Sequence, residues 1–196
     1  MAKLIAITGG IGSGKTVVAE ILRSLSYPVY DCDSEAKRIM DNSPEIHSAL
    51  CRHIHPKSVL DGIIDRKLIS QIVFNDAEAL TRLNSIVHTA VKEDLALWVA
   101  RQVAEGRGLQ FVESAILISS GLINNVDEVW MVVAPEDLRI ERVKNRNNLP
   151  VEAIKARMEA QAGEFIYPEN KEVNYLTNDG LTALLSQIHK ILDGKM

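Results

Sequence analysis

The stretch Gly9-Gly10-Ile11-Gly12-Ser13-Gly14-Lys15-Thr16 fits the pattern G-x-x-x-x-G-K-[ST], which is a phosphate-binding loop. The apolar run before it, residues 4–8, predicts a short buried strand. An apolar stripe typical of one helix face follows it: Val17, Val18, Ile21, Leu22 and Leu25. Because strand, glycine loop and helix are the context that this motif requires, we expect the chain to bind a nucleoside triphosphate.

Each residue type in the loop has a physical role. The glycines let the backbone take conformations that a Cβ forbids, so that several N–H groups point at one anion, and the following helix adds the positive end of its dipole. Lys15 can reach the β- and γ-phosphates, and the Thr16 hydroxyl can bind Mg²⁺. The predicted ATP contacts are Gly10, Ile11, Gly12, Ser13, Gly14, Lys15, Thr16 and Val17. The alternative is a glycine-rich turn without a ligand.

Composition sets the limits of the remaining prediction. The length of 196 residues suits one α/β core with an insertion, and 46% hydrophobic with 24% charged residues is ordinary for a globular protein. A net charge of −4 argues against a nucleic-acid-binding surface over the whole molecule. We find no apolar run of about 18 residues and no signal peptide. Cys32 and Cys51 lack metal-ligand spacing, so we expect reduced thiols and a cytoplasmic protein without an obligate protein partner.

A second strand is predicted at residues 28–31, and its end carries Asp31-Cys32-Asp33. In open parallel sheets, ligands sit beyond the carboxyl ends of the strands, so these carboxylates are expected on the triphosphate side. Helices are predicted next at residues 34–40 and 44–53, followed by a turn at 59–64 and a helix capped by Asp65. Residues 77–105 predict one long helix or two abutting helices, closed by Gly106. This interval exceeds a simple crossover and predicts a helical substrate-binding insertion.

The sheet resumes at residues 109–116 and 128–134, and residues 173–176 predict a last strand. Between them, Pro135 starts a helix, and Pro150 divides the basic span 139–157 into two helices. A closing helix is predicted by a last apolar stripe with helical spacing, which comprises Leu181, Leu184, Leu185, Ile188, Ile191 and Leu192. We predict one three-layer α/β/α domain over residues 1–196 with a parallel five-stranded sheet: core 1–32, 107–138 and 171–196, insertion about 33–106, and helical lid about 139–170.

An insertion and a basic helical hairpin suggest a small-molecule phosphotransferase, because a basic lid neutralises the γ-phosphate and excludes water. Arg142 and Arg146 would share a helix face; alternatively they form a solvated face with Glu141 and Glu152. Asp33 is the best candidate for the base that takes the acceptor's proton, and its alternative role is a helix N-cap. Asp31 is the second candidate for this base, but the role we favour for it is to support neighbouring site residues or to cap the end of the strand.

The chain resembles the dephospho-coenzyme A kinase family over nearly its whole length. The resemblance rests on residues 8–16, Asp31-Cys32-Asp33, Asp61-Gly62, Asp65-Arg66, Val73-Phe74, residues 83–88, Glu141-Arg142-Val143, Arg146, Gln161 and Asn178-Asp179-Gly180. It implies a P-loop kinase with ATP and Mg²⁺ that phosphorylates the ribose 3′-hydroxyl of dephospho-CoA, the last step of coenzyme A synthesis. By the same matching, Asp33 is the base, and Lys15 and Arg142 stabilise the transferring phosphoryl. Arg146 and Asn178 would contact the nucleotide, and Thr8, Asp33, Arg66 and His88 the acceptor.

The chain departs from the family pattern at three places. Thr89 follows His88 where the family usually has proline, and Val173 falls where an aspartate is expected. Residues 115–119 read Ala-Ile-Leu-Ile-Ser where the family usually has Pro-Leu-Leu-Phe-Glu, so a carboxylate is missing at Ser119. These differences put the acceptor contacts of the third strand in doubt and leave the loop, Asp33 and Arg142 untouched.

Three alternatives remain. A nucleoside or nucleoside-monophosphate kinase shares the core and lid and differs in its acceptor. A GTPase would need Asn-Lys-x-Asp and a switch Asp-x-x-Gly, and neither is present. A non-catalytic nucleotide-binding module would be expected to lose Lys15 or the base, and both are retained.

Overall fold

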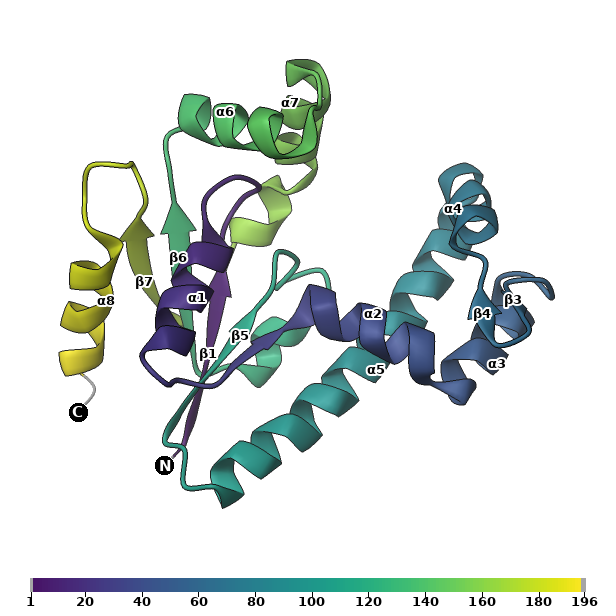
Figure 1. The fold of residues 1–196 in the computed structure, drawn as a ribbon, viewed down its shortest axis with the longest axis horizontal. Helices are drawn as coiled ribbons and strands as arrows, with labels where there is room; N and C mark the ends of the chain where they lie inside the picture. The colour runs from purple at the N-terminus through teal and green to yellow at the C-terminus, as the bar shows by residue number, and fades with distance from the viewer. Residues whose placement is uncertain (1, 195–196) are drawn as a thin grey trace. The chain divides into compact units, whose positions relative to one another are not determined.

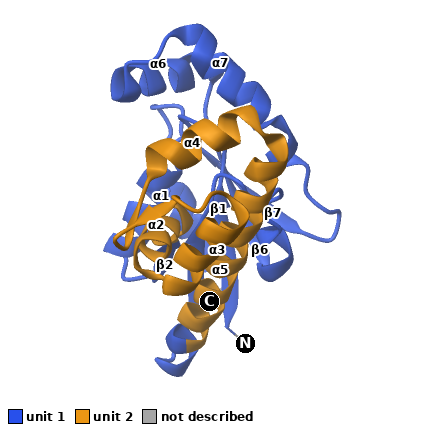
Figure 2. Cartoon of the chain, turned by 90° about the vertical axis from the view of Figure 1, so that its right-hand side faces the viewer, with its two compact units in different colours: residues 1–30, 101–196 blue, residues 31–100 orange. Residues whose placement is uncertain are grey.

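The computed structural model describes residues 2–194, which divide into two compact units (Figure 2). Of the described residues, unit 1 comprises 2–30 and 101–194, and unit 2 comprises Asp31–Ala100. None of the helices in the described part has the length and apolar composition of a membrane span.

Unit 1 is built on a sheet whose five strands follow the order β2-β5-β1-β6-β7 (Figure 1). The strands are β1 Lys3–Thr8, β2 Val29–Asp31, β5 Leu109–Glu113, β6 Glu128–Val133 and β7 Glu172–Thr177. β1 pairs in parallel with both β5 and β6, and β6 pairs in parallel with β7. The three central strands β1, β5 and β6 are buried along nearly their whole length, and such parallel strands appear in the sequence as nearly continuous apolar runs. The predicted α/β class with a parallel five-stranded sheet is confirmed.

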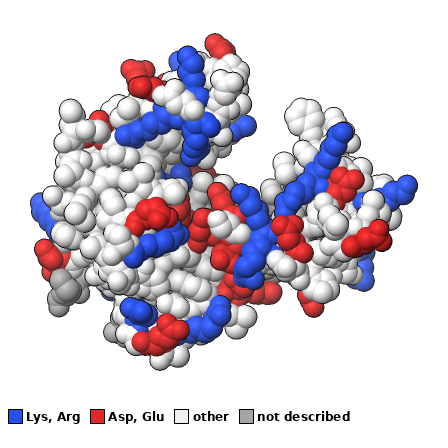
Figure 3. Space-filling view, viewed as in Figure 1, with Lys and Arg blue, Asp and Glu red and all other residues white. Residues whose placement is uncertain are grey.

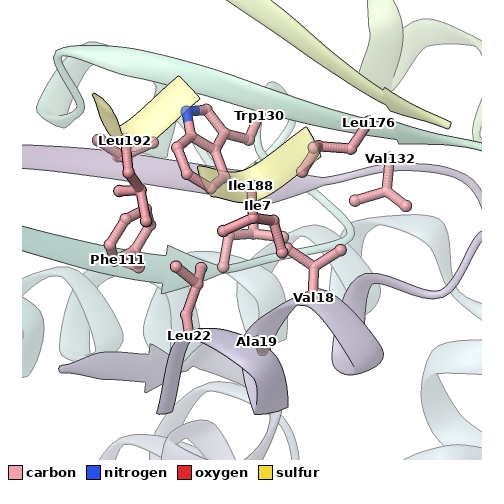
Figure 4. Packing of buried hydrophobic residues seen from close by; sticks show 11 residues of the cluster. Ile7, Val18, Ala19, Leu22, Phe111, Trp130, Val132, Leu176, Ile188 and Leu192 are labelled. Carbon is pink, nitrogen blue, oxygen red and sulfur yellow. The ribbon is translucent and has the colours of Figure 1, made fainter. Parts of the chain in front are cut away.

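The core of unit 1 lies where α1 (Lys15–Ser24) and α8 (Leu184–Asp193) pack on the strands (Figure 4). Val18 and Leu22 of α1 and Ile188 of α8 are fully buried with strand residues. The rings of Phe111 and Trp130 meet edge to face with centroids 5.1 Å apart. Burial of each large apolar side chain contributes roughly 1.5–3 kcal/mol, so this cluster fixes the sheet that carries the loop.

The other elements of unit 1 are connections between strands. They are η1 Leu122–Asn125, α6 Glu136–Asn147, α7 Val151–Ala160 and η2 Ala162–Phe165. Pro150 stands directly before α7, so the predicted division of the basic span into two helices is confirmed.

Unit 2 is mostly helical. Its elements are α2 Cys32–Asn42, α3 Pro44–His53, β3 Val59–Leu60, β4 Ile63–Ile64, α4 Arg66–Asn75 and α5 Ala77–Ala104, the last of which continues into unit 1. The predicted turn at 59–64 is a two-stranded hairpin, because Asp61 (φ 50°) and Gly62 (φ 78°) provide the positive φ angles that tight hairpins need. The Asp65 carboxylate accepts a hydrogen bond from the Leu68 N–H at 2.9 Å, which confirms the predicted N-cap.

The second helix begins earlier than predicted, and its cap is a different aspartate. Oδ1 of Asp31 accepts hydrogen bonds from the backbone N–H of Asp33 at 3.0 Å and of Ser34 at 3.2 Å. α2 therefore starts at Cys32, and the N-cap role considered for Asp33 belongs to Asp31. Asp33 instead lies exposed in the first turn of α2.

Two other boundaries were predicted wrongly. β5 ends at Glu113 rather than at residue 116, because the Ser114 hydroxyl accepts the Ile116 N–H at 3.2 Å and bends the chain. α8 begins at Leu184, and Leu181 is 93% exposed. The Asp179 carboxylate accepts the N–H groups of Leu181 (2.9 Å) and Thr182 (2.7 Å), which holds residues 180–182 in a turn instead of a helix.

Candidate active site

The phosphate loop connects the end of β1 to the start of α1 in unit 1. Thr8 ends the strand and is fully buried, and Lys15 begins the helix. Gly14 occupies the N-cap position, so no side chain caps α1, and its first turn holds no acidic residue. The positive dipole end of α1 is therefore not occupied by a capping or acidic side chain of its own first turn, which suits the binding of an anion.

The glycines of the loop serve two different purposes. Gly9, Gly12 and Gly14 have φ angles of 149°, 80° and 98°, which a side chain rarely tolerates. Gly10 has no positive φ, so the conformational explanation is wrong for this position. A Cβ there would lie 2.3 Å from Nη2 of Arg139, so any larger residue at position 10 would displace the guanidinium of this α6 side chain.

The Thr16 hydroxyl donates a hydrogen bond of 2.8 Å to Oε1 of Glu113, which is 8% exposed at the end of β5. Glu113 is not among the site residues predicted from the sequence. The sequence held a partial signal, because Glu113 ends a predicted buried strand and a carboxylate there is expected at the ligand edge of a parallel sheet. Nearby, Nζ of Lys15 donates to the Gly9 carbonyl at 2.8 Å and so lies over the loop.

These oxygens fit a magnesium site that is completed by the substrate. Mg²⁺ prefers hard oxygen ligands, which a threonine hydroxyl and a glutamate provide, and it keeps several waters beside one or two carboxylates. No cluster of three or more His, Cys, Asp or Glu side chains suited to a metal occurs within residues 2–194. Thr16 and Glu113 are therefore the residues that could hold Mg²⁺ at this site.

Arg142 of α6 lies half-buried against the loop rather than in a solvated face. Its Nη1 donates to the Asn178 carbonyl at 3.1 Å and to the Gly12 carbonyl at 3.4 Å, and Nη2 donates to Asn178 Oδ1 at 3.3 Å. Asn178 also donates through Nδ2 to the Ser13 carbonyl at 2.8 Å. The predicted residues Arg142 and Asn178 are thus brought together with the phosphate loop.

Arg146 is in a different setting from Arg142. It is exposed, and its Nε donates to Asn147 Oδ1 at 2.9 Å. Figure 3 shows further Lys and Arg side chains gathered over α6 and α7. The exposed side chain of Arg146 matches the solvated alternative, and its contact with the nucleotide stays a prediction, as does that of the exposed Val17.

The predicted acceptor residues Asp33, Arg66 and His88 belong to unit 2. Arg66 forms an exposed ion pair with Asp41 at 2.7 Å, and His88 is half-buried in α5. Asp31 is the N-cap of α2, so the exposed Asp33 carboxylate does not cap this helix. The binding of an acceptor by these residues stays a prediction.

Comparison with known proteins identifies relatives along the whole chain. The family model described as dephospho-CoA kinase matches residues 3–177. A dephospho-CoA kinase of Porphyromonas gingivalis is 41% identical over 189 residues, covering 96% of this chain and 92% of the relative. One from Bacteroides fragilis is 35% identical over 192 residues, covering 98% and 92%. The crystal structure of TT1252 from Thermus thermophilus aligns with a TM-score of 0.83 and 33% identity, covering 100% of this chain and 98% of that one.

Proposed function

This chain belongs to the dephospho-CoA kinase family, and we propose that it transfers the γ-phosphoryl group of ATP to the ribose 3′-hydroxyl of dephospho-CoA. The products are coenzyme A and ADP, and the reaction is the last step of coenzyme A synthesis. The observation that carries the proposal is the family match over residues 3–177, supported by an uncapped α1 N-terminus behind a complete phosphate loop.

Phosphoryl transfer depends mainly on positioning and on neutralising charge. Lys15 would move from the Gly9 carbonyl to the β- and γ-phosphate oxygens, and Thr16 and Glu113 would hold the metal. When bound, Mg²⁺ would supply positive charge that neutralises the triphosphate. Arg142, already directed at the loop, would stabilise the transferring phosphoryl.

We assign the proton acceptor to Asp33. The acceptor oxygen forms a bond to the γ-phosphorus as the bond from phosphorus to the β–γ bridging oxygen breaks, and the hydroxyl proton passes to the Asp33 carboxylate. ADP leaves with the electrons of the broken bond. The exposure of this side chain and its freedom from the cap of α2 support the assignment.

The family match also supports a role for each segment of the chain. We assign substrate binding to about residues 33–106, the lid to about 139–170, and nucleotide binding to the remaining core. The protein would act in the cytoplasm on small molecules and without nucleic acid.

The direct test is an assay of ADP release with ATP·Mg²⁺ and a panel of acceptors. We expect turnover with dephospho-CoA far above that with nucleosides, nucleoside monophosphates or water. Preferential turnover of a nucleoside or its monophosphate would identify the alternative kinase. ATP binding without release of ADP with any acceptor would identify a non-catalytic module.

Arg142→Ala should lower kcat more than it weakens ATP binding, because a lid arginine acts mainly after the site has closed. Loss of a charge-assisted hydrogen bond suggests a decrease in kcat of roughly 10- to 100-fold. Steady-state kinetics and ATP titration measure the two effects, and Arg107→Ala, at an exposed position outside the lid and before the amino end of β5, is the matched control. Weakened ATP binding with unchanged kcat at saturation would make Arg142 a ground-state anchor.

Glu113→Gln should raise the Mg²⁺ concentration required for half-maximal activity by roughly 10- to 100-fold, as expected when a group that orients a metal ligand is altered. The amide oxygen can still accept the Thr16 hydroxyl, so the change removes charge while it keeps the shape. Activity measured against Mg²⁺ concentration gives the shift, and Glu159→Gln at an exposed position of α7 is the control. An identical Mg²⁺ dependence in Glu113→Gln would remove Glu113 from the site.

A further inference from the structure

The peptide groups on both sides of Ile11, in the phosphate loop, are held by two side chains from opposite ends of one helical hairpin. The Ile11 N–H donates to Oε1 of Gln161 at 2.8 Å, and Nε of Arg139 donates to the Ile11 carbonyl at 2.9 Å. Arg139 lies near the start of α6, and Gln161 is the residue at which α7 ends. The hairpin therefore grips one loop residue with both of its ends.

The Arg139 side chain is packed closely against the phosphate loop. Arg139 is half-buried, and burial lowers its pKa from the ordinary value although Glu136 opposes the change. A Cβ on Gly12 would lie 2.6 Å from the Arg139 carbonyl oxygen, as a Cβ on Gly10 would collide with its guanidinium. Two glycines of the loop thus admit the backbone and the side chain of this one arginine.

The Gln161 side is fixed by the segment that follows it. Glu164 is 7% exposed, and its carboxylate accepts the N–H groups of Ile118 at 2.7 Å and of Ser119 at 3.2 Å. The Tyr167 hydroxyl donates to the sulfur of Met131 at 3.4 Å, and burial raises the pKa of Tyr167 to about 12. With residues 164 and 167 attached to the sheet side of unit 1, the Gln161 amide is held in place.

We propose that Gln161 and Arg139 are positioning residues that clamp Ile11 and hold the phosphate loop in the shape that receives the triphosphate. Neither side chain touches the reacting atoms in this role. The clamp reserves the Ile11 N–H for Gln161, and it therefore removes that group from the predicted ATP contacts. The clamp also fixes both ends of the α6–α7 hairpin at the loop, so that motion of the lid is confined to the residues between 139 and 161. The kinetic consequence rests on the proposed kinase function, whereas the clamp does not.

Amide hydrogen exchange at Ile11, measured by NMR on the nucleotide-free protein, tests the clamp without any assumption about activity. Gln161→Met keeps the length of the side chain and removes the acceptor, so exchange at Ile11 should accelerate about tenfold, the equivalent of one hydrogen bond. Gln161→Glu retains an acceptor oxygen and should keep the protection. Gln187→Met removes a comparable pair of amide-to-backbone bonds at Thr177 (both 2.8 Å) and serves as the control for a general loss of stability.

Kinetics of Arg139→Met, Gln161→Met and the double variant test the joint role. Each single change should lower kcat/KM for ATP about tenfold, and the double variant should lose little more, because both side chains hold the same residue. Arg107→Met, at an exposed position before the amino end of β5, should match the wild type. The clamp is wrong if Ile11 exchange in Gln161→Met is unchanged or accelerates no more than in Gln187→Met, or if the kinetic losses multiply. Absence of kinase activity in the wild type would refute the proposed function and leave the exchange test in force.

Discussion

Replacing Lys15 with alanine should lower kcat by roughly 10²-fold or more. This is the loss typical of removing one preorganised group that stabilises charge in the transition state. Negative charge grows on the β–γ bridge and the leaving phosphate as the bond breaks, and the loop lysine neutralises it. In the structure, Nζ of Lys15 already lies over the loop at the Gly9 carbonyl, 2.8 Å away, so little rearrangement brings it to a phosphate.

The measurement compares single-turnover rates at saturating ATP and dephospho-CoA. Lys190→Ala removes the same charge from an exposed position of α8 and should leave the rate unchanged. Thermal unfolding of both variants establishes that each one is folded. Wild-type kcat in folded Lys15→Ala protein would refute the role assigned to the loop.

Asp33→Asn should fold and bind ATP·Mg²⁺ with nearly wild-type affinity, while phosphorylation of dephospho-CoA falls by roughly 10²–10⁴-fold, the usual span for general-base catalysis. A ribose hydroxyl is a weak nucleophile at neutral pH, and an asparagine cannot take its proton. The structure sharpens this prediction, because Asp31 and not Asp33 caps α2. The substitution should therefore leave the start of the helix intact.

Asp31→Asn is the matched control, since asparagine caps helices about as well as aspartate and the activity should fall less. ATP affinity by calorimetry and turnover are measured on both variants. An active Asp33→Asn enzyme beside an inactive Asp31→Asn enzyme would move the base to Asp31. A loss of ATP affinity that accounts for the whole decrease in Asp33→Asn would instead make Asp33 a nucleotide-binding residue.

Sequence and structure disagree mainly where a polar side chain bonds to the backbone close by. Residues 109–116 have the composition of a strand, yet the Ser114 hydroxyl ends it at Glu113. The stripe from Leu181 has helical spacing, yet Asp179 holds the first residues in a turn. Periodicity averages over a window of residues, so it does not register one hydrogen bond that stops an element.

The sequence by itself determined the features that depend on neighbouring residues: the strand, loop and helix around Lys15, the turn at Gly62, and the order of strands and helices along the chain. Apolar periodicity, glycine and proline positions and cap residues act over a few residues, and they can be recognised without tertiary structure. The family motifs added function, because they tie residues far apart in the chain to one known site.

Only the tertiary structure decided which side chains surround the loop. The bonds from Thr16 to Glu113, from Arg139 to Ile11, from Ile11 to Gln161 and from Asn178 to Ser13 join residues separated by 97, 128, 150 and 165 positions. The parallel order of β5, β1, β6 and β7 brings these segments to one sheet edge, because crossover connections return every strand in the same direction. No local pattern marks such pairs, so Glu113, Arg139 and Gln161 acquire their places at the loop only once the chain has folded.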